Sequence, residues 1–284
     1  MYLIADSGST KTDWVVLDAQ GEVPETFFTK GFNPTIVSTL FIIDALKQSA
    51  QFLKAIPATK KIFFYGSGCS TPELNNVIIE AFRLFSPAVE IEIKNDLYAS
   101  VHATTGNDPA IVCIIGTGSN ACSFDGNQVT DDDFSLGYIL GDEGSGSYLG
   151  KQLLKDFFYD TMPAAVSKAF NDRYHLKRNE VIERIYRRER PNEFLASFVP
   201  FIRDHIQNEY CRQMVEDSFD SFIQYFILRF AHAGDVSIHC TGSVGYYFKD
   251  IFEICLHKHT LKPGKILVSP MDGLVRYVKK YLIS

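Results

Sequence analysis

The chain has 284 residues, of which 46% are apolar and 13% aromatic, enough to bury the core of one large domain or of two ordinary ones. Lys and Arg total 28 against 34 for Asp and Glu, a formal net charge of −6. This balance argues against nonspecific binding to nucleic acid, which normally uses a basic surface. It says little about small anionic ligands, because a few backbone amides can hold them.

The N-terminal residues predict neither a secretory signal nor a membrane anchor. "MYLIAD" lacks a basic region and reaches a carboxylate before an apolar segment could form. No run approaches the roughly 18 apolar residues that span a bilayer. The cysteines form no CxxC pair, so neither a zinc site nor an iron–sulfur cluster is expected, and reduced core thiols in a cytoplasmic protein are favoured. They are Cys69, Cys113, Cys122, Cys211, Cys240 and Cys255.

The first hundred residues predict a strand meander followed by alternating strands and helices. Strands are expected at 2–6, 13–18, 23–30, 61–68 and 89–93, and helices at 36–54, at 71–85 and from Asn95. Gly8 marks the first turn. Thr71 is the expected N-cap of the second helix, with Pro72 at its first position.

The same order restarts after the cluster of Gly, Asn, Asp and Pro at 105–110. Strands are expected at 110–116, 120–126, 235–242 and 265–268, with another possible at 127–134, and helices at 244–257 and 271–282. Residues 151–232 are mostly helical in pattern. The repetition predicts two α/β domains with a cleft between them, where ligands favour the carboxyl ends of strands.

Glycine-rich loops follow three of these strands, at 6–12, 116–120 and 240–245. Glycine permits positive φ and leaves amides uncovered, and such amides with Ser or Thr hydroxyls can form a nest for phosphate oxygens. None of the loops is a Walker A motif, and the Gly-rich 144–150 segment lacks the preceding strand of a Rossmann fingerprint. A nucleotide, if bound, must be held in another way.

Five segments resemble, in order, the conserved motifs of the N-acetylglucosamine kinase family, which lies beside the BadF/BadG/BcrA/BcrD-type ATPases in the sugar kinase/Hsp70/actin superfamily. They are "ADSGSTKTDWVVLD", "NDLYAS", "IIGTGSNACSFDG", "GYILGDEGSGSYLG" and "CTGSVG". The resemblance implies two ribonuclease H-like, actin-like ATPase domains with an interdomain cleft. With the boundary near the cluster at 105–110, we expect these domains at 1–108 and 109–270. The second would carry a helical insertion at about 151–232, and a C-terminal helix at about 271–284 could pack back on the first domain.

The resemblance answers why a carboxylate precedes the hydroxyl-rich turn. It implies that Asp6 orients Mg²⁺, which prefers hard oxygen ligands. The turn after it would hold the transferred phosphate, through Ser7, Gly8, Ser9, Thr10, Lys11 and Thr12. The alternative is a plain hairpin that Asp6 caps.

Asp96 starts a helix directly after a strand, and the resemblance makes it the catalytic base that accepts the proton of the sugar hydroxyl. The alternative is an ordinary helix cap, which Asn95 or Asp96 could supply equally well.

The remaining site residues also follow from the resemblance. The expected nucleotide ligands of the second domain are Gly116, Thr117, Gly118, Ser119, Gly242 and Ser243. The expected sugar ligands are Asn33, Asn95, Asn120, Gly137, Asp142 and Glu143. Asn33 could instead form the turn before Pro34. The mammalian-type kinases carry a Trp in a GWG segment where this chain has Leu136, which puts the identity of the hexosamine in doubt.

The resemblance therefore implies an ATP- and Mg²⁺-dependent kinase that phosphorylates the 6-hydroxyl of an amino sugar, N-acetylglucosamine first. We expect a cytoplasmic protein without nucleic-acid or membrane partners, and a possible homodimer. Glucosamine or N-acetylmuramate are alternative substrates. A BadF-type ATPase that activates a partner enzyme is a second reading, which the scattered cysteines count against. A sugar-sensing regulator is a third, and we expect no DNA-binding segment before the first strand.

Overall fold

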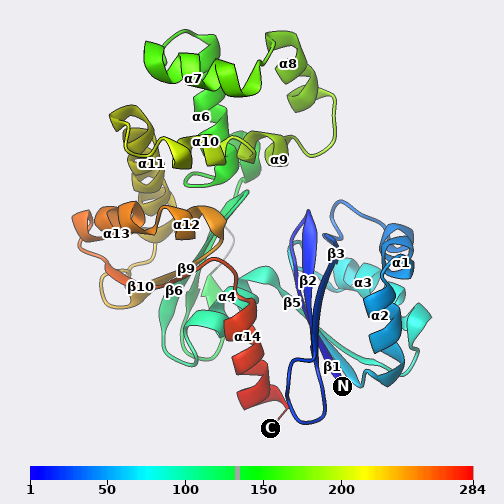
Figure 1. Ribbon diagram of the computed structural model, residues 1–284. Helices are drawn as coiled ribbons and strands as arrows, with labels where there is room; N and C mark the ends of the chain where they lie inside the picture. Colours follow the sequence, from blue (N-terminus) through cyan, green and yellow to red (C-terminus); the bar gives the residue numbers. More distant parts are fainter. Residues whose placement is uncertain (132–134, 284) are drawn as a thin grey trace. The chain divides into compact units, whose positions relative to one another are not determined.

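The computed structural model describes residues 1–131 and 135–283, and the chain divides into two compact units. Unit 1 comprises Met1–Gly106 and Pro270–Ser284, and unit 2 comprises Asn107–Ser269. Within the described residues each unit contains one five-stranded sheet, ordered β3-β2-β1-β4-β5 in unit 1 and β8-β7-β6-β9-β10 in unit 2 (Figure 1). In both sheets the first three strands pair antiparallel and the last two add in parallel, so the repeated order seen in the sequence is a repeated topology.

The strands of unit 1 are β1 (Tyr2–Ser7), β2 (Lys11–Leu17), β3 (Glu25–Lys30), β4 (Lys61–Gly66) and β5 (Glu90–Asn95). Its helices are α1 (Thr39–Lys47), α2 (Ala50–Ala55), the 3₁₀ turn η1 (Ile56–Ala58), α3 (Pro72–Phe85), α4 (Asp96–Thr104), α14 (Met271–Tyr277) and the π-helical turn η3 (Val278–Leu282). Side chains alternate between sheet faces. Leu3 and Ala5 pack in a core with residues of α1–α3, whereas Ile4 packs with residues of α4 and α14 (Figure 1).

Trp14, the only tryptophan, lies at the centre of the α1–α3 core and is 1% exposed. Its ring stacks on Phe27 at 5.7 Å between centroids and contacts Phe52 and Phe82 at 5.6 and 5.9 Å. Its indole N–H donates to Thr29 Oγ1 at 3.0 Å, so the one polar atom of the ring has a partner. The aromatic content therefore serves as packing in this unit.

Local capping signals explain where the observed helices agree with expectation and where they differ. The Thr71 cap is confirmed, because its Oγ1 accepts from Leu74 N at 3.3 Å. The single helix expected at 36–54 is wrong: Ser49 accepts from Phe52 N and starts a second helix there. The helix expected at 244–257 is likewise divided at Phe248, which ends one helix and precedes the next.

The strands of unit 2 are β6 (Ala110–Ile115), β7 (Ser119–Phe124), β8 (Val129–Asp131), β9 (Ser237–Thr241) and β10 (Lys262–Leu267). The strand expected at 127–134 is present as β8, and its last three residues lie outside the described part of the chain. The first helices are α5 (Gly137–Leu140), α6 (Gly146–Phe158), α7 (Ala164–Tyr174), α8 (Arg178–Tyr186), α9 (Pro191–Ala196) and α10 (Val199–Asp204). The others are α11 (Glu209–Phe222), the π-helical turn η2 (Ile223–Ile227), α12 (Ser243–Tyr247) and α13 (Lys249–Lys258).

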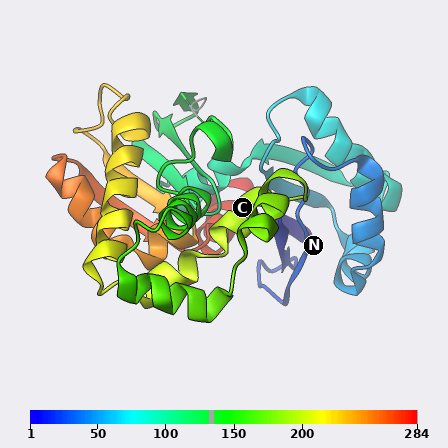
Figure 2. The same cartoon turned by 90° about the horizontal axis from the view of Figure 1, so that it is seen from above.

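Helices α7–α10 gather at one end of unit 2, beyond its sheet (Figures 1 and 2). Phe170 packs against Phe198 and Phe201 there, at centroid distances of 5.6 and 5.1 Å. These rings belong to the same core as Ile111 of β6 and Leu153 of α6. The insertion is therefore continuous with the core of unit 2.

The structure describes all six cysteines, and all are free and buried, which confirms the expected core thiols. None of the helices in the described part of the chain combines the length and apolar character that a membrane span requires.

A buried histidine joins α4 to the C-terminal helix within unit 1. His102 is 6% exposed, and its Nδ1 lies 3.1 Å from the hydroxyl oxygen of buried Tyr65. Its ring stacks on Tyr277 at 3.8 Å between centroids. Burial, aided by the Lys94 ammonium, lowers the pKa of His102 to about 3.

We expect His102 to make unit 1 less stable in acid. Because its pKa is lower in the folded state than the usual 6.5, the unfolded chain binds the proton first. The free energy of unfolding should fall as pH drops from 6.5 towards 3, with a slope of about 1.4 kcal/mol per pH unit at most from this group. Urea unfolding of wild type and His102→Gln between pH 7 and 4 measures the difference in slope. Equal slopes would contradict the assignment.

Candidate functional site

The carboxyl ends of β1, β4 and β5 bring the predicted catalytic residues of unit 1 together. The register pairs Ser7 with Gly66 and Gly66 with Asn95, so the residues just beyond these positions lie at one edge of the sheet. Asp6 shares the sheet face of Ile4, which α4 covers, and Asp96 is the first residue of α4. Their carboxylates influence each other: burial, followed by the charges of Asp96 and Asp13, raises the pKa of Asp6 to about 7.

Asn95 supplies the helix cap that the sequence left open between two residues. Its Oδ1 accepts from Leu97 N at 3.0 Å. The Asp96 carboxylate accepts from the hydroxyl of Ser67 and from the first amides of α4, but burial outweighs these bonds and raises the pKa of Asp96 to about 6. Asp96 is thus a half-buried carboxylate with a defined hydrogen-bond donor beside it.

Ser67 is a site residue that the sequence reasoning missed. It follows β4 directly, and its amide donates to Ser7 O at 2.8 Å. The only sequence signal was a serine between glycines at a strand end, and the partner across the sheet becomes visible only with the strand register.

The hydroxyls of Ser7 and Thr12 connect the first turn to the segment after β3. Their oxygens lie 2.6 Å apart, Phe32 N donates to Ser7 Oγ at 3.0 Å, and Thr12 Oγ1 donates to Lys30 O at 3.0 Å. Both side chains are fully buried. Gly8 N donates to Lys11 O at 2.9 Å, which closes the turn.

Lys11, expected at the phosphate, has its Nζ 2.6 Å from Asp13 Oδ1 and 5.4 Å from the centre of the Phe28 ring. Three residues predicted at the phosphate, Ser7, Lys11 and Thr12, thus have side-chain partners within unit 1. Any direct role of these three at a phosphate remains a prediction.

Asn33 makes the turn contacts that were its alternative role. Its Oδ1 accepts from Thr35 N at 3.0 Å and from Thr35 Oγ1 at 2.7 Å, and its Nδ2 donates to Ser9 Oγ at 3.1 Å. A Cβ at Gly68 would lie 2.2 Å from Asn33 Oδ1. Asn33 therefore joins the first turn to the Ser67–Gly68 loop.

In unit 2 the predicted phosphate loop rests on the start of α6. Gly146 N donates to Gly116 O at 2.8 Å and Ser147 N to Thr117 O at 3.0 Å. Ser119 Oγ donates to Glu143 O at 2.6 Å, which ties this loop to the 141–145 segment. The motifs at 116–120 and 142–143 are adjacent.

Asp142 lies against this loop in a strained conformation. Its φ is 59°, it is 6% exposed, and a Cβ at Gly118 would lie 3.0 Å from its Oδ2. Ser135 Oγ donates to Asp142 Oδ1 at 3.3 Å. Burial raises the pKa of Asp142 although Ser119 N and Ser135 donate to it.

Lys151 of α6, a residue that the sequence reasoning missed, contacts the segment before Asp142. Gly137 begins α5 with a φ of 70°, and Leu136 beside it is 67% exposed. Lys151 of α6 donates from Nζ to Tyr138 O at 3.0 Å and thereby holds α5 to α6. Burial lowers the pKa of Lys151, whereas the carboxylates of Glu143 and Asp142 act to raise it. Asn120 is half-buried on β7, next to this region through Ser119.

The third glycine turn closes on the end of β6. Gly242 has a φ of 112°, and a Cβ there would lie 2.4 Å from Ile115 O, so only glycine fits. Ser243 begins α12. The predicted nucleotide residues of unit 2 therefore meet at the carboxyl ends of β6 and β9.

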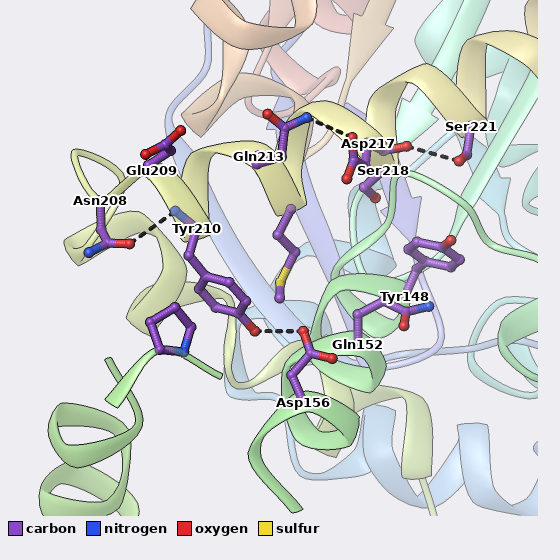
Figure 3. A pocket seen from close by; sticks show the side chains of 12 residues that line it. Tyr148, Gln152, Asp156, Asn208, Glu209, Tyr210, Gln213, Asp217, Ser218 and Ser221 are labelled. Carbon is purple, nitrogen blue, oxygen red and sulfur yellow. Dashed lines mark hydrogen bonds between the residues drawn. The ribbon is translucent and has the colours of Figure 1, made fainter. Parts of the chain in front are cut away.

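A separate cavity of about 750 Å³ lies between α6 and α11 (Figure 3). Its lining contains none of the predicted site residues. Tyr210 donates to Asp156 Oδ2 at 2.7 Å, and Gln213 Nε2 donates to Asp217 Oδ1 at 2.8 Å, so these polar groups bond one another (Figure 3).

Known structures share this fold. A Porphyromonas gingivalis protein provisionally named an N-acetylglucosamine kinase is 37% identical, with a TM-score of 0.93 over 99% of both chains. A Chromobacterium violaceum protein with the same provisional name is 14% identical, with a TM-score of 0.72 over 98% of both chains. A ROK family glucokinase from Streptomyces griseus, solved with glucose and AMPPNP, is 13% identical, with a TM-score of 0.53 over 98% of both chains. No family model and no curated protein matches the chain.

The fold and these likenesses define a sugar kinase with the α/β, actin-like ATPase fold, which confirms the predicted fold class. Because the 37% identity extends over 99% of the chain, the chain belongs to the N-acetylglucosamine kinase family, as the motifs predicted.

Proposed function

We propose that this kinase transfers the γ-phosphoryl group of ATP to the 6-hydroxyl of an amino sugar, N-acetylglucosamine first. The observation that carries the proposal is the half-buried Asp96 at the head of α4, held by Ser67, in a chain 37% identical to a provisionally named N-acetylglucosamine kinase. The acceptor oxygen would form a bond to the γ-phosphorus, the bond from γ-phosphorus to the bridging oxygen would break, and ADP would leave. The hydroxyl proton would pass to Asp96.

The pKa of Asp96 suits that role. At about 6 it leaves most of the carboxylate ionised at neutral pH, yet makes it more basic than an ordinary aspartate. The proposed acceleration comes mainly from positioning and from charge stabilisation around the phosphates.

Asp6 has the chemistry of a magnesium ligand. Its pKa near 7 reflects burial beside two other carboxylates, and a cation there would relieve that repulsion. In residues 1–131 and 135–283 no cluster of three or more His, Cys, Asp or Glu side chains could hold a metal ion. A site with Asp6 as a carboxylate ligand still fits Mg²⁺, which commonly takes one or two carboxylates and keeps several waters. When bound, Mg²⁺ would neutralise charge on the nucleotide phosphates.

The loops of unit 2 support a nucleotide and sugar role. The turn at Thr117 and Gly118 offers backbone amides and a hydroxyl, which suit phosphate oxygens. Asp142 and Glu143 follow on the adjacent segment, where carboxylate oxygens can accept from sugar hydroxyls. A cytoplasmic homodimer is part of the same proposal.

A coupled assay of ADP release tests the proposal across N-acetylglucosamine, glucosamine, N-acetylmuramate, N-acetylmannosamine and glucose. We expect the highest kcat/KM for N-acetylglucosamine and a product that carries phosphate on the 6-hydroxyl by NMR. A preference for another amino sugar would support the assignment as a kinase but overturn N-acetylglucosamine as its substrate. ADP release that is independent of every sugar would favour the ATPase reading.

Replacing Ser67 by Ala should alter the pH dependence of this reaction. The Ser67 hydroxyl lowers the pKa of Asp96, so its loss should raise that pKa and move the acidic limb of the kcat/KM profile to higher pH. We expect kcat at neutral pH to fall about tenfold, from the poorer ionisation and alignment of Asp96. Ser67→Thr keeps the donor and should restore the acidic limb. An unchanged limb in folded Ser67→Ala would show that Ser67 does not position the base.

A further inference from the structure

Two elements of unit 2 hold the segment that carries the predicted sugar carboxylates. On β7, Ser119 Oγ donates to Glu143 O at 2.6 Å, and Ser119 N donates to the Asp142 carboxylate. On α11, Ser218 Oγ accepts from Gly144 N at 3.1 Å, although the two residues are 74 positions apart in the chain. The first contact joins two motifs of the family resemblance. The second comes from the helical region 151–232, which carries little of that resemblance.

The contact with α11 is buried and closely packed. Ser218 is 1% exposed, and Gly144 is buried as well. Gly144 has a φ of 82°, and a Cβ there would lie 3.0 Å from the Cβ of Phe222, also on α11. A buried amide that loses its acceptor costs free energy, because water cannot replace the lost partner. The Gly144 amide is therefore held where the Ser218 hydroxyl can accept from it.

This hydrogen bond acts on the turn that directs the two carboxylates. Asp142 has a φ of 59°, and Ser145 N donates to Asp142 O at 3.0 Å, so residues 142–145 form one tight turn. Gly144 lies inside that turn. A shift of Gly144 would therefore rotate the peptide units next to Asp142 and Glu143. Binding groups need their supporting contacts to stay in the productive geometry.

We propose that Ser218 is a positioning residue for sugar binding: through the Gly144 amide it sets the direction in which the Asp142 and Glu143 carboxylates meet the sugar. The inference rests on the proposed function, which makes these two carboxylates sugar ligands. Ser218 itself lines the separate cavity between α6 and α11, and it acts on the sugar only through the turn (Figure 3). It gives α11 a role in sugar affinity.

Ser218→Ala removes the acceptor and tests this directly. We expect the KM for sugar, and the Kd for sugar measured by calorimetry, to rise about tenfold through weaker bonds to the carboxylates. At saturating sugar kcat should fall less than about twofold, and the KM for ATP should stay unchanged, because Asp96 keeps its own contacts in unit 1. Ser218→Thr keeps the hydroxyl and should restore the affinity for sugar.

The matched control is Ser221→Ala, the same change on the same helix. The Ser221 hydroxyl donates to Asp217 O within α11 and has no contact with the turn (Figure 3). We expect wild-type KM values for sugar and ATP from it.

Gly144→Ala approaches the same contact from its other side. It leaves every residue of α11 in place, but the new Cβ is too close to Phe222 and the positive φ is strained for alanine. The turn should move away from Ser218, and the KM for sugar should rise about tenfold or more. This variant decides the question if Ser218→Ala does not fold.

The outcomes separate this inference from the proposed function. A wild-type KM for sugar in folded Ser218→Ala or in Gly144→Ala would overturn the positioning role and leave the sugar kinase intact. Lower stability of Ser218→Ala in urea with unchanged sugar affinity would show a purely structural serine and also overturn the role. A lower kcat with an unchanged sugar KM would do the same. A wild-type protein without sugar-dependent ADP release would overturn the proposed function and this inference together.

Discussion

Asp96→Asn should lower kcat by about 10²–10⁴-fold and leave the affinity for the sugar nearly unchanged. The amide keeps the shape of the side chain but cannot accept the hydroxyl proton. Burial, the hydrogen bond from Ser67 and the first amides of α4 already fix the position of the carboxylate. The substitution should therefore change the surrounding structure little. Steady-state ADP release at saturating ATP and sugar measures the effect, and sugar binding by calorimetry separates kcat from affinity.

The matched control is Asp44→Asn, the same change at an exposed carboxylate on α1 of the same unit. We expect wild-type turnover from it. A folded Asp96→Asn protein with turnover equal to that of Asp44→Asn would remove Asp96 as the base and, with it, the main support for the proposed chemistry.

Trp14→Ala should lower the free energy of unfolding of unit 1 by about 3–5 kcal/mol. The ring is 1% exposed and contacts four aromatic residues, so its removal leaves a large cavity that the sheet and α1–α3 cannot refill without shifting. The substitution also leaves the Thr29 hydroxyl without the indole donor. Urea unfolding followed by far-UV circular dichroism is the measurement, because the variant loses the sole tryptophan.

Phe28→Ala provides the control on the neighbouring strand. Phe28 is 71% exposed, so its loss should cost less than about 1 kcal/mol. Destabilisation of similar size in the two variants would mean that the core around Trp14 is far more adaptable than its packing indicates.

Much of the fold could be predicted because local chemistry and tertiary packing agree. The Thr71–Pro72 signal starts α3 as expected, since the cap bond forms within four residues of the chain. The apolar run at 110–115 reads as a buried strand, and five of the six residues of β6 are indeed buried. The predicted helices were wrong at Ser49 and Phe248, where the apolar spacing continues although the helical conformation of the backbone is interrupted.

The candidate site was predictable only as a set of motifs. Asp6, Asp96 and Gly242 drew attention as carboxylates or a glycine near the ends of strands, and the family resemblance supplied their roles. Thr117 and Asp142 drew attention as members of glycine-rich segments that match the same family. Ser67 and Lys151 carry no such local mark. Each matters through a partner on another element: the Asp96 carboxylate for Ser67 and the Tyr138 carbonyl for Lys151.

The order of amino acids was thus enough for the repeated order of strands and helices and for the loops where chemistry is expected, because these depend on short-range spacing and turn residues. The resemblance of five motifs was enough for the family. Side-chain alternation and strand register then placed Asp6 on the face that α4 covers and Ser67 beside Asp96. The hydroxyls of Ser7 and Thr12 are occupied by contacts with Phe32 and Lys30, which lie 25 and 18 residues further along the chain. Such contacts leave no periodic trace in a sequence, since their free energy depends on which surfaces meet once the chain has folded.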